Sequence, residues 1–173
     1  MHYIIDGYNF LFAFNAQAVT NLTSDREELI HSLGILLNGL QASIVFDSSF
    51  PHADLYPSRI FQKNIEIIYA PEGQTADDYI IELITYKKNR SEIRVITSDS
   101  HLARHIRALS CYSQSIPLFV DFLIKRQRKL GKKGKPPVIP TSYEIERLTK
   151  IFEKKLEEPP NSEWLINPRK SAF

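Results

Sequence analysis

Cysteine, long apolar runs and basic residues near the N-terminus are scarce or missing in this sequence of 173 residues. The single cysteine, Cys111, excludes a disulfide within the chain and is typical of a reducing compartment. No apolar run approaches the ~20 residues that a membrane-spanning helix requires, so a membrane partner is not expected. Asp6 interrupts the first apolar stretch, and no lysine or arginine precedes it, which argues against a secretory signal peptide. These absences predict a soluble, cytoplasmic protein.

The composition predicts one globular domain followed by a tail. Hydrophobic residues form 43% of the chain and charged residues 24%, and a chain of this length can bury a sizeable core. The last helical pattern, which begins at Thr141 and Glu144, continues to about residue 158. We therefore expect a single domain over residues 1–158, with a C-terminal helical extension, and an extended tail over residues 159–173.

Charge is distributed unevenly along the chain. The net charge is +2, yet residues 1–124 hold 9 Lys and Arg against 14 Asp and Glu. Residues 125–135 hold seven basic residues and no acid, and these are Lys125, Arg126, Arg128, Lys129, Lys132, Lys133 and Lys135. An acidic body with one concentrated basic segment predicts a polyanionic partner, and the alternative is a segment that is merely solvated.

Short apolar stretches that alternate with helical patterns predict the fold. The expected buried strands are residues 3–5, 43–46, 64–69 and 93–96, with a short edge strand at 112–113. Between the first two strands, a capping box at Ser24 and Glu27 precedes a stripe of leucines over residues 29–40, which predicts a core helix. This alternation is typical of a three-layer α/β/α domain with a central parallel sheet.

Acidic residues follow the predicted strands. Asp6, Asp47 and Asp99 come at or just after the ends of three strands, and Asp77 and Asp78 lie in the first turn of a helix that follows another. The carboxyl ends of parallel strands share one edge of the sheet, so we expect these acids to meet there. The simpler alternatives are that Asp77 and Asp78 only stabilise a helix N-terminus, and that Asp47 only closes a turn.

Several carboxylates at one place require a cation at neutral pH, because each raises the pKa of the next. Oxygen ligands without cysteine or histidine favour Mg²⁺ or Mn²⁺. Such ions activate a water and stabilise charge during phosphodiester hydrolysis, and the basic segment would hold the phosphate backbone. His101 and His105 share a helix face, where surface or RNA contacts are expected rather than metal binding, and Ser98 is expected to cap its helix.

Three motifs resemble those of a known family. The motifs are IDGYN at residues 5–9, TADD at residues 75–78 and VITSD at residues 95–99. In order and spacing they resemble the YacP-like NYN-domain family, a branch of the PIN-like nuclease superfamily, over about residues 3–130. The resemblance implies a strand order of 3-2-1-4-5, which sets Asp6 and Asp99 on either side of the switch point of the sheet.

The same resemblance implies a divalent-metal-dependent endoribonuclease, with bacterial members linked to mRNA decay on the ribosome. Asn9 would orient a water or a phosphate in that reaction. The implied acids of the site are Asp6, Asp77, Asp78 and Asp99, and Asp47 is a further candidate metal ligand.

RNA contacts are expected from the basic segment, from Arg104 and Arg107, and from Tyr8, which could stack on an unpaired base. Two other functions stay open. One is a non-catalytic RNA- or ribosome-binding module with a vestigial site. The other is a small-molecule phosphatase, although no Asp-x-Asp pair follows the first strand.

Overall fold

The computed structural model describes residues 1–15, 21–48, 58–62 and 64–132. The chain divides into two units, Met1–Pro140 and Thr141–Phe173, and every described residue belongs to the first. The expected C-terminal helical extension, the tail at residues 159–173, and Lys133 and Lys135 of the basic segment therefore lie outside the described residues.

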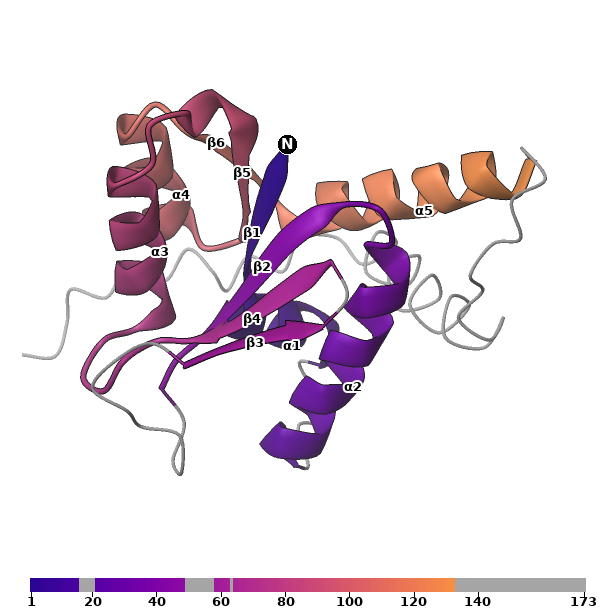
Figure 1. The fold of residues 1–173 in the computed structure, drawn as a ribbon, viewed down its shortest axis with the longest axis horizontal. Coiled ribbons are helices and arrows are strands. Elements are labelled where there is room, and N and C mark those ends of the chain that lie inside the picture. Colours follow the sequence, from indigo (N-terminus) through magenta and orange to yellow (C-terminus); the bar gives the residue numbers. More distant parts are fainter. Residues whose placement is uncertain (16–20, 49–57, 63, 133–173) are drawn as a thin grey trace, which may run out of the picture. The chain divides into compact units, whose positions relative to one another are not determined.

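A six-stranded sheet forms the centre of the first unit (Figure 1). Its strands lie in the order β3-β4-β2-β1-β5-β6, and all neighbours are parallel except β3 and β4. The strands are β1 (His2–Asp6), β2 (Gln41–Phe46), β3 (Ser58–Gln62), β4 (Ile65–Tyr69), β5 (Ile93–Ile96) and β6 (Tyr112–Gln114). The expected order of the five parallel strands is confirmed.

The antiparallel edge strand β3 was not expected from the sequence. It pairs with β4 alone, and its apolar residues Ile60 and Phe61 are 45% and 74% exposed. An exposed edge strand does not need the continuous run of apolar residues by which a buried strand is identified in a sequence.

Helices cover both faces of the sheet, as Figure 1 shows. The helices are α1 (Gly7–Asn15), α2 (Leu22–Leu36), α3 (Ala76–Thr85), α4 (Ser100–Ala108) and α5 (Ile116–Lys132), with a short 3₁₀ turn η1 (Arg90–Glu92). Among the described residues, none of these helices is long and apolar enough to cross a membrane. The three-layer α/β/α architecture is confirmed.

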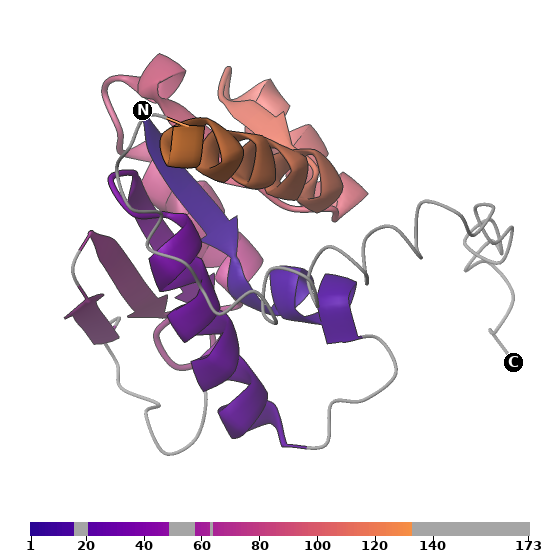
Figure 2. The same ribbon diagram turned by 90° about the vertical axis from the view of Figure 1, so that its right-hand side faces the viewer.

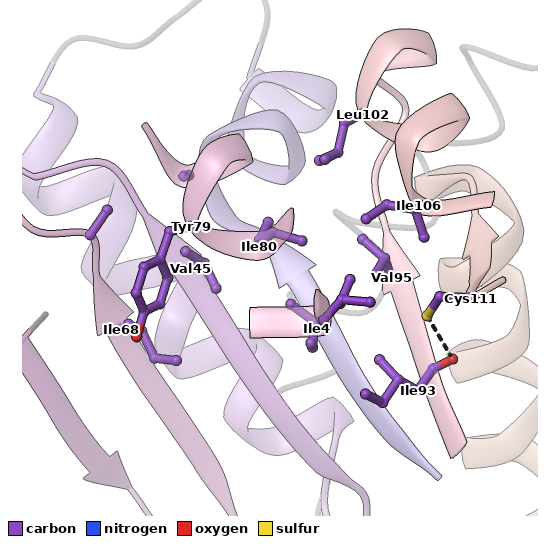
Figure 3. Close-up of a cluster of buried hydrophobic side chains, with 13 residues drawn as sticks. Ile4, Val45, Ile68, Tyr79, Ile80, Ile93, Val95, Leu102, Ile106 and Cys111 are labelled. Atoms are coloured by element: carbon purple, nitrogen blue, oxygen red, sulfur yellow. Dashed lines mark hydrogen bonds between the residues drawn. The ribbon is translucent and has the colours of Figure 1, made fainter. Parts of the chain in front are cut away.

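The alternation of side chains along each strand supplies both halves of the core. Ile4 and Val95 point toward α3 and α4, where they pack with Ile80 and Ile106 (Figure 3). Tyr3 points to the opposite face, where its ring lies 5.2 Å from that of Phe119 in α5. Each such side chain contributes roughly 1.5–3 kcal/mol when it is fully buried.

Helix α2 begins three residues earlier than expected, because its N-cap is Asn21 and not Ser24. The side chain of Asn21 caps it by accepting hydrogen bonds from the backbone N–H groups of Thr23 (3.2 Å) and Ser24 (3.3 Å). The expected capping box at Ser24 and Glu27 is therefore wrong, because Asn21 already satisfies these donors one turn earlier. The apolar stripe itself is largely confirmed, since the leucines at 29, 33, 36 and 37 are buried.

Candidate active site

Asp6 is the last residue of β1, and the chain turns directly from this strand into α1 at Gly7. A side chain at position 7 would collide with the ring of Phe46, so glycine is required where the helix begins. The turn holds Asp6 at the carboxyl edge of the sheet, in the strand between β2 and β5, with only 5% of the residue exposed. The expectation that Asp6 ends a buried strand at this edge is confirmed.

The carboxyl group of Asp6 is held by two hydrogen bonds. Its Oδ1 accepts from the backbone N–H of Asn9 (3.1 Å), and its Oδ2 accepts from the hydroxyl of Thr97 (3.1 Å). Burial nevertheless raises the pKa of Asp6 to about 7, with further upward contributions from Asp77 and Asp47, while the two hydrogen bonds act in the opposite direction. Near neutral pH the protonated and ionised forms of this carboxyl group are therefore both populated.

Thr97 joins the ends of β1 and β5, and sequence reasoning gave it no role. Its hydroxyl donates to Asp6 and accepts from the backbone N–H of Asp99 (3.0 Å), and the residue is 2% exposed. One residue on, the N–H of Ser98 donates to the amide oxygen of Asn9 (2.8 Å). A signal for Thr97 is nevertheless present in the sequence. Thr97 is a polar residue that directly follows an apolar strand, and the strand expected beside it ends in an acid, Asp6.

Asp99 caps α4, the helix that begins at Ser100. Its Oδ1 accepts from the backbone N–H groups of His101 (2.7 Å) and Leu102 (2.8 Å). The expectation that Ser98 caps this helix is wrong, because extended backbone at Asp99 brings that carboxylate to the free N–H groups. The hydroxyl of Ser98 instead accepts from the backbone N–H of Ile116, at the start of α5 (3.3 Å).

The start of α3 supplies acids to the same edge. Asp47, which follows β2, accepts from the backbone N–H of Ala76 through Oδ1 (2.6 Å). Thr75 caps the helix as expected, and its hydroxyl donates to Oδ2 of Asp78 (2.8 Å). The structure thereby distinguishes the adjacent acids, because Asp78 is exposed and bound to the cap, whereas Asp77 is only partly exposed.

Electrostatic interactions connect the acids from separate parts of the chain. The pKa of Asp77 is raised by burial first, then by Asp99, Asp47 and Asp78, and His101 acts in the opposite direction. Asp6 in turn is affected by Asp77 and Asp47. The predicted meeting of these acids at one edge of the sheet is therefore present in the fold.

The donor chemistry of this edge fits a hard divalent cation. The mutually interacting side chains are carboxylates, which are the oxygen donors that Mg²⁺ and Mn²⁺ prefer. Within the described ranges, however, no group of three or more His, Cys, Asp or Glu side chains is arranged so that it could hold a metal ion. The site therefore fits a divalent cation in the type of its donor atoms and in its negative charge, but not in the arrangement of those atoms.

The basic segment does not lie where the sequence analysis expected. Helix α5 begins near the carboxyl edge, but Arg126 donates to the carbonyl of Asn38 (2.6 Å) and Gln127 donates to that of Leu36 (3.1 Å). These carbonyls precede β2 and so lie at the amino edge of the sheet. Figure 1 shows the end of α5 extending beyond the sheet, away from the N-terminus, whereas the two overlap in the view of Figure 2. For the part of the basic segment that the structure describes, the expectation that it lies beside the acids is wrong, because α5 leads away from them.

Within α5, the basic side chains differ in their surroundings. Lys125 forms an ion pair with Asp121 (2.7 Å), and Arg128 and Lys129 are exposed. Lys132 is the last residue of the helix. Binding of RNA by this helix stays a prediction.

Tyr8 lies in α1, two residues after Asp6. Its ring meets the edge of Phe46 (5.1 Å between centroids) and stacks with Phe12 (6.0 Å), which is 48% exposed. Sequence reasoning missed Arg26, which is buried with its guanidinium 5.1 Å from the centroid of the Tyr69 ring. The expected role of Tyr8 in base stacking stays a prediction, with Phe12 as its exposed neighbour.

A mostly parallel α/β sheet with acids gathered where β1 and β5 lie side by side defines a PIN-like domain. Domains of the NYN and PIN-like type are generally nucleases. A comparison with family models gives a match to the YacP-like NYN domain over residues 3–161, and the chain belongs to this family.

Solved structures support the same fold. A crystal structure of Rae1 (YacP) from Bacillus subtilis is 21% identical in sequence, with 91% of each chain covered and a TM-score of 0.59. A crystal structure of a single-residue mutant of Rae1 is also 21% identical, with 84% of this chain and 90% of that chain covered and a TM-score of 0.56. The comparison with curated proteins gave no match.

Proposed function

We propose that this protein is a divalent-metal-dependent endoribonuclease that hydrolyses phosphodiester bonds in RNA. The observation that carries the proposal is that acids from separate segments lie close enough to interact at one edge of the sheet, where burial first and then the neighbouring acids raise the pKa values of Asp6 and Asp77. Such strain among like charges is typical of sites that work with a cation. Membership of a family that generally comprises nucleases supports the same conclusion.

Asp6, Asp47, Asp77 and Asp99 are the residues that would hold the ion, and since the described residues contain no ready-made group of three donors, binding would have to draw these carboxylates together. When bound, Mg²⁺ or Mn²⁺ would supply Lewis-acid stabilisation of the phosphate charge and a lower pKa for the attacking water. Asp99 caps α4 through Oδ1, so its Oδ2 takes part in neither capping bond. Asp78 would contribute charge rather than a ligand, because its carboxylate is bound to Thr75.

The uncharged residues of the site would orient these acids. Thr97 fixes the rotation of the Asp6 carboxyl group by donating to Oδ2. Asn9 ties the start of α1 to the turn before α4 through its bond to Ser98. Through this bond Asn9 keeps the two sides of the site in register, and we propose that its amide N–H group then faces a phosphate or the attacking water.

The test is cleavage of a labelled single-stranded RNA by the purified protein with Mn²⁺, with Mg²⁺ or with EDTA. We expect internal cuts only with metal, and a loss of at least about 100-fold for Asp77→Asn. Asp77 is preferred to Asp99 for substitution, because Asp99 also caps α4 and its loss would disturb the fold.

The same assay separates the other functions. Salt-sensitive binding of RNA without cleavage under any metal condition would favour the non-catalytic module. Hydrolysis of phosphomonoesters without cleavage of RNA would favour a phosphatase. Because the family resemblance implies mRNA on the ribosome, the assay includes mRNA in a stalled ribosome complex as a second substrate, and cutting of this substrate alone would keep the proposal and define its target.

A further inference from the structure

Helix α4 carries a continuous basic face. Its nine residues, SHLARHIRA, include two arginines and two histidines and no acid. Leu102 and Ile106 are fully buried against the sheet, whereas His101, Arg104, His105 and Arg107 are exposed. At 100° per residue the four basic side chains occupy one arc of about 160°, opposite the buried stripe.

This face begins at the candidate active site. Asp99, the cap of α4, is one of the gathered acids, and His101 in the first turn is close enough to Asp77 to lower its pKa. The ring of His105 meets that of His101 edge-on, with 4.6 Å between centroids. Arg107, farther along, donates to the hydroxyl of Ser113 (3.1 Å) on the neighbouring strand β6. The basic residues therefore lead away from the acids in one direction, over about 9 Å from His101 to Arg107.

We propose that α4 is the surface along which a single-stranded RNA leaves the acids, with its phosphates bound by Arg104 and Arg107 and assisted by His101 and His105. The inference rests on the proposed function, because it takes the polyanion to be the RNA substrate. The gathered carboxylates repel the phosphates that flank the one at the ion, and α4 provides a positive surface that adjoins these carboxylates. Among the described residues of α5, Arg126 and its neighbour Gln127 contact carbonyls at the amino edge of the sheet, so this stretch of the helix does not adjoin the acids.

The test compares three double variants that each remove two positive charges. Arg104→Gln with Arg107→Gln alters α4, Lys125→Gln with Lys129→Gln alters α5, and Lys87→Gln with Lys88→Gln is the matched control. Lys87 and Lys88 are exposed and follow α3, and Lys87 lies near His2 at the amino edge. Binding of a fluorescent 12-nucleotide RNA is measured by anisotropy in EDTA, so that cleavage does not interfere, at several salt concentrations.

We expect the α4 variant to bind about tenfold or more weakly and to reduce the slope of log K against log salt by about 1.4, as the loss of two phosphate contacts to a single strand requires. The control variant should bind within about twofold of the wild type, and the α5 variant should lose less affinity than the α4 variant. The charge-retaining variant Arg104→Lys with Arg107→Lys should keep the salt slope, and thermal unfolding should show that each variant is folded.

Unchanged affinity of a folded α4 variant, or a larger loss in the α5 variant, would overturn the inference. Its failure is distinct from that of the proposed function. A wild-type protein that binds RNA through α4 and never cuts it refutes the nuclease and keeps this surface. A protein that cuts RNA equally well with and without Arg104 and Arg107, at RNA concentrations below its Kd, refutes the surface alone.

Discussion

The two ends of the sheet use polar residues in opposite ways. In the half nearer the amino edge, His2 donates to Ser43 (2.9 Å), and Ser43 donates to Glu66 (2.8 Å). Glu66 also accepts from Arg59 (2.7 Å), which donates in turn to Tyr79 (2.8 Å). Donors meet acceptors and positive charge meets negative charge along this series of bonds, which links β1, β2, β4, β3 and α3 through their side chains.

At the carboxyl edge, like charges face one another. Asp6, Asp47, Asp77 and Asp99 interact unfavourably, and burial adds to the cost at Asp6 and Asp77. Proteins tolerate such an arrangement where it serves a function rather than folding. The hydrogen-bonded network from His2 to Tyr79 (the satisfied network) therefore serves the fold. The cluster of mutually repelling acids at the carboxyl edge is the candidate active site.

The largest expected effect is a difference in RNA cleavage between variants of two adjacent residues, Asp77 and Asp78. Asp77→Asn should lower RNA cleavage by at least about 100-fold, whereas Asp78→Asn should lower it by no more than about threefold. The reason is that Asp77 interacts with acids from other segments, while the carboxylate of Asp78 is bound to Thr75. Initial cleavage rates at saturating Mn²⁺ provide the measurement, and equal losses in both variants would contradict the distinction.

The second prediction concerns the free energy of unfolding that is lost when the buried carboxyl group of Asp6 ionises. Because its pKa is about 7 in the fold and lies near 3.8 in the unfolded chain, the unfolded state releases the proton first as pH rises. The free energy of unfolding should therefore fall between about pH 4 and pH 7 and stay at the lower value above that. Asp6→Asn should remove this loss and stabilise the protein at pH 8 by up to ~4 kcal/mol in EDTA, with no gain at pH 4.

Urea unfolding of both proteins across this pH range measures the effect. Glu72→Gln, at an exposed carboxylate, is a suitable control and should leave the pH profile unchanged. A stabilisation that is the same at pH 4 and pH 8 would show that ionisation of Asp6 is not its source.

The third prediction breaks the satisfied network. Ser43→Ala should destabilise the protein by about 1–3 kcal/mol, because it removes the hydroxyl that joins His2 to Glu66 in a buried place. RNA cleavage by the folded variant should stay within about twofold of the wild type. Denaturant titration and cleavage rates at a temperature well below the melting point test both parts, and a selective loss of cleavage would mean that the two ends are coupled.

The smallest effect is expected for Thr97→Val, which keeps the shape of the side chain. Loss of the hydroxyl should raise the pKa of Asp6 further, because the bond from Thr97 favours the ionised carboxylate. Loss of its bond to the N–H of Asp99 should cost about 1 kcal/mol of stability. Carboxyl carbon NMR titration follows the first effect and urea unfolding the second, with Thr97→Ser as the variant that should restore both.

The gathering of acids was predictable because it follows from topology. Once strands and helices alternate, the ends of all parallel strands share one edge, and Asp6 and Asp99 meet although they are far apart in sequence. Which of these polar residues caps a helix was not predictable, because it depends on which side-chain oxygen reaches which hydrogen-bonding group. Asp99 rather than Ser98 caps α4, and the carboxylate of Asp78 rather than that of Asp77 binds Thr75.

The direction of α5 could not be predicted from the sequence pattern either. A run of basic residues specifies a charged surface, but its position depends on the direction in which the helix leaves the sheet. That direction is set by packing, in which Phe119 meets Tyr3 and Arg126 reaches Asn38. The exposed edge strand β3 was missed for a related reason, since its apolar residues are not buried.

Each of the three acids that end or follow a strand at this edge also binds the beginning of a helix. Asp6 accepts from Asn9 in α1, Asp47 from Ala76 in α3, and Asp99 from His101 and Leu102 in α4. The positive ends of three helix dipoles are thus directed at the negative cluster. The backbone itself supplies part of the countercharge, so the polypeptide can assemble this acidic edge before any ion arrives.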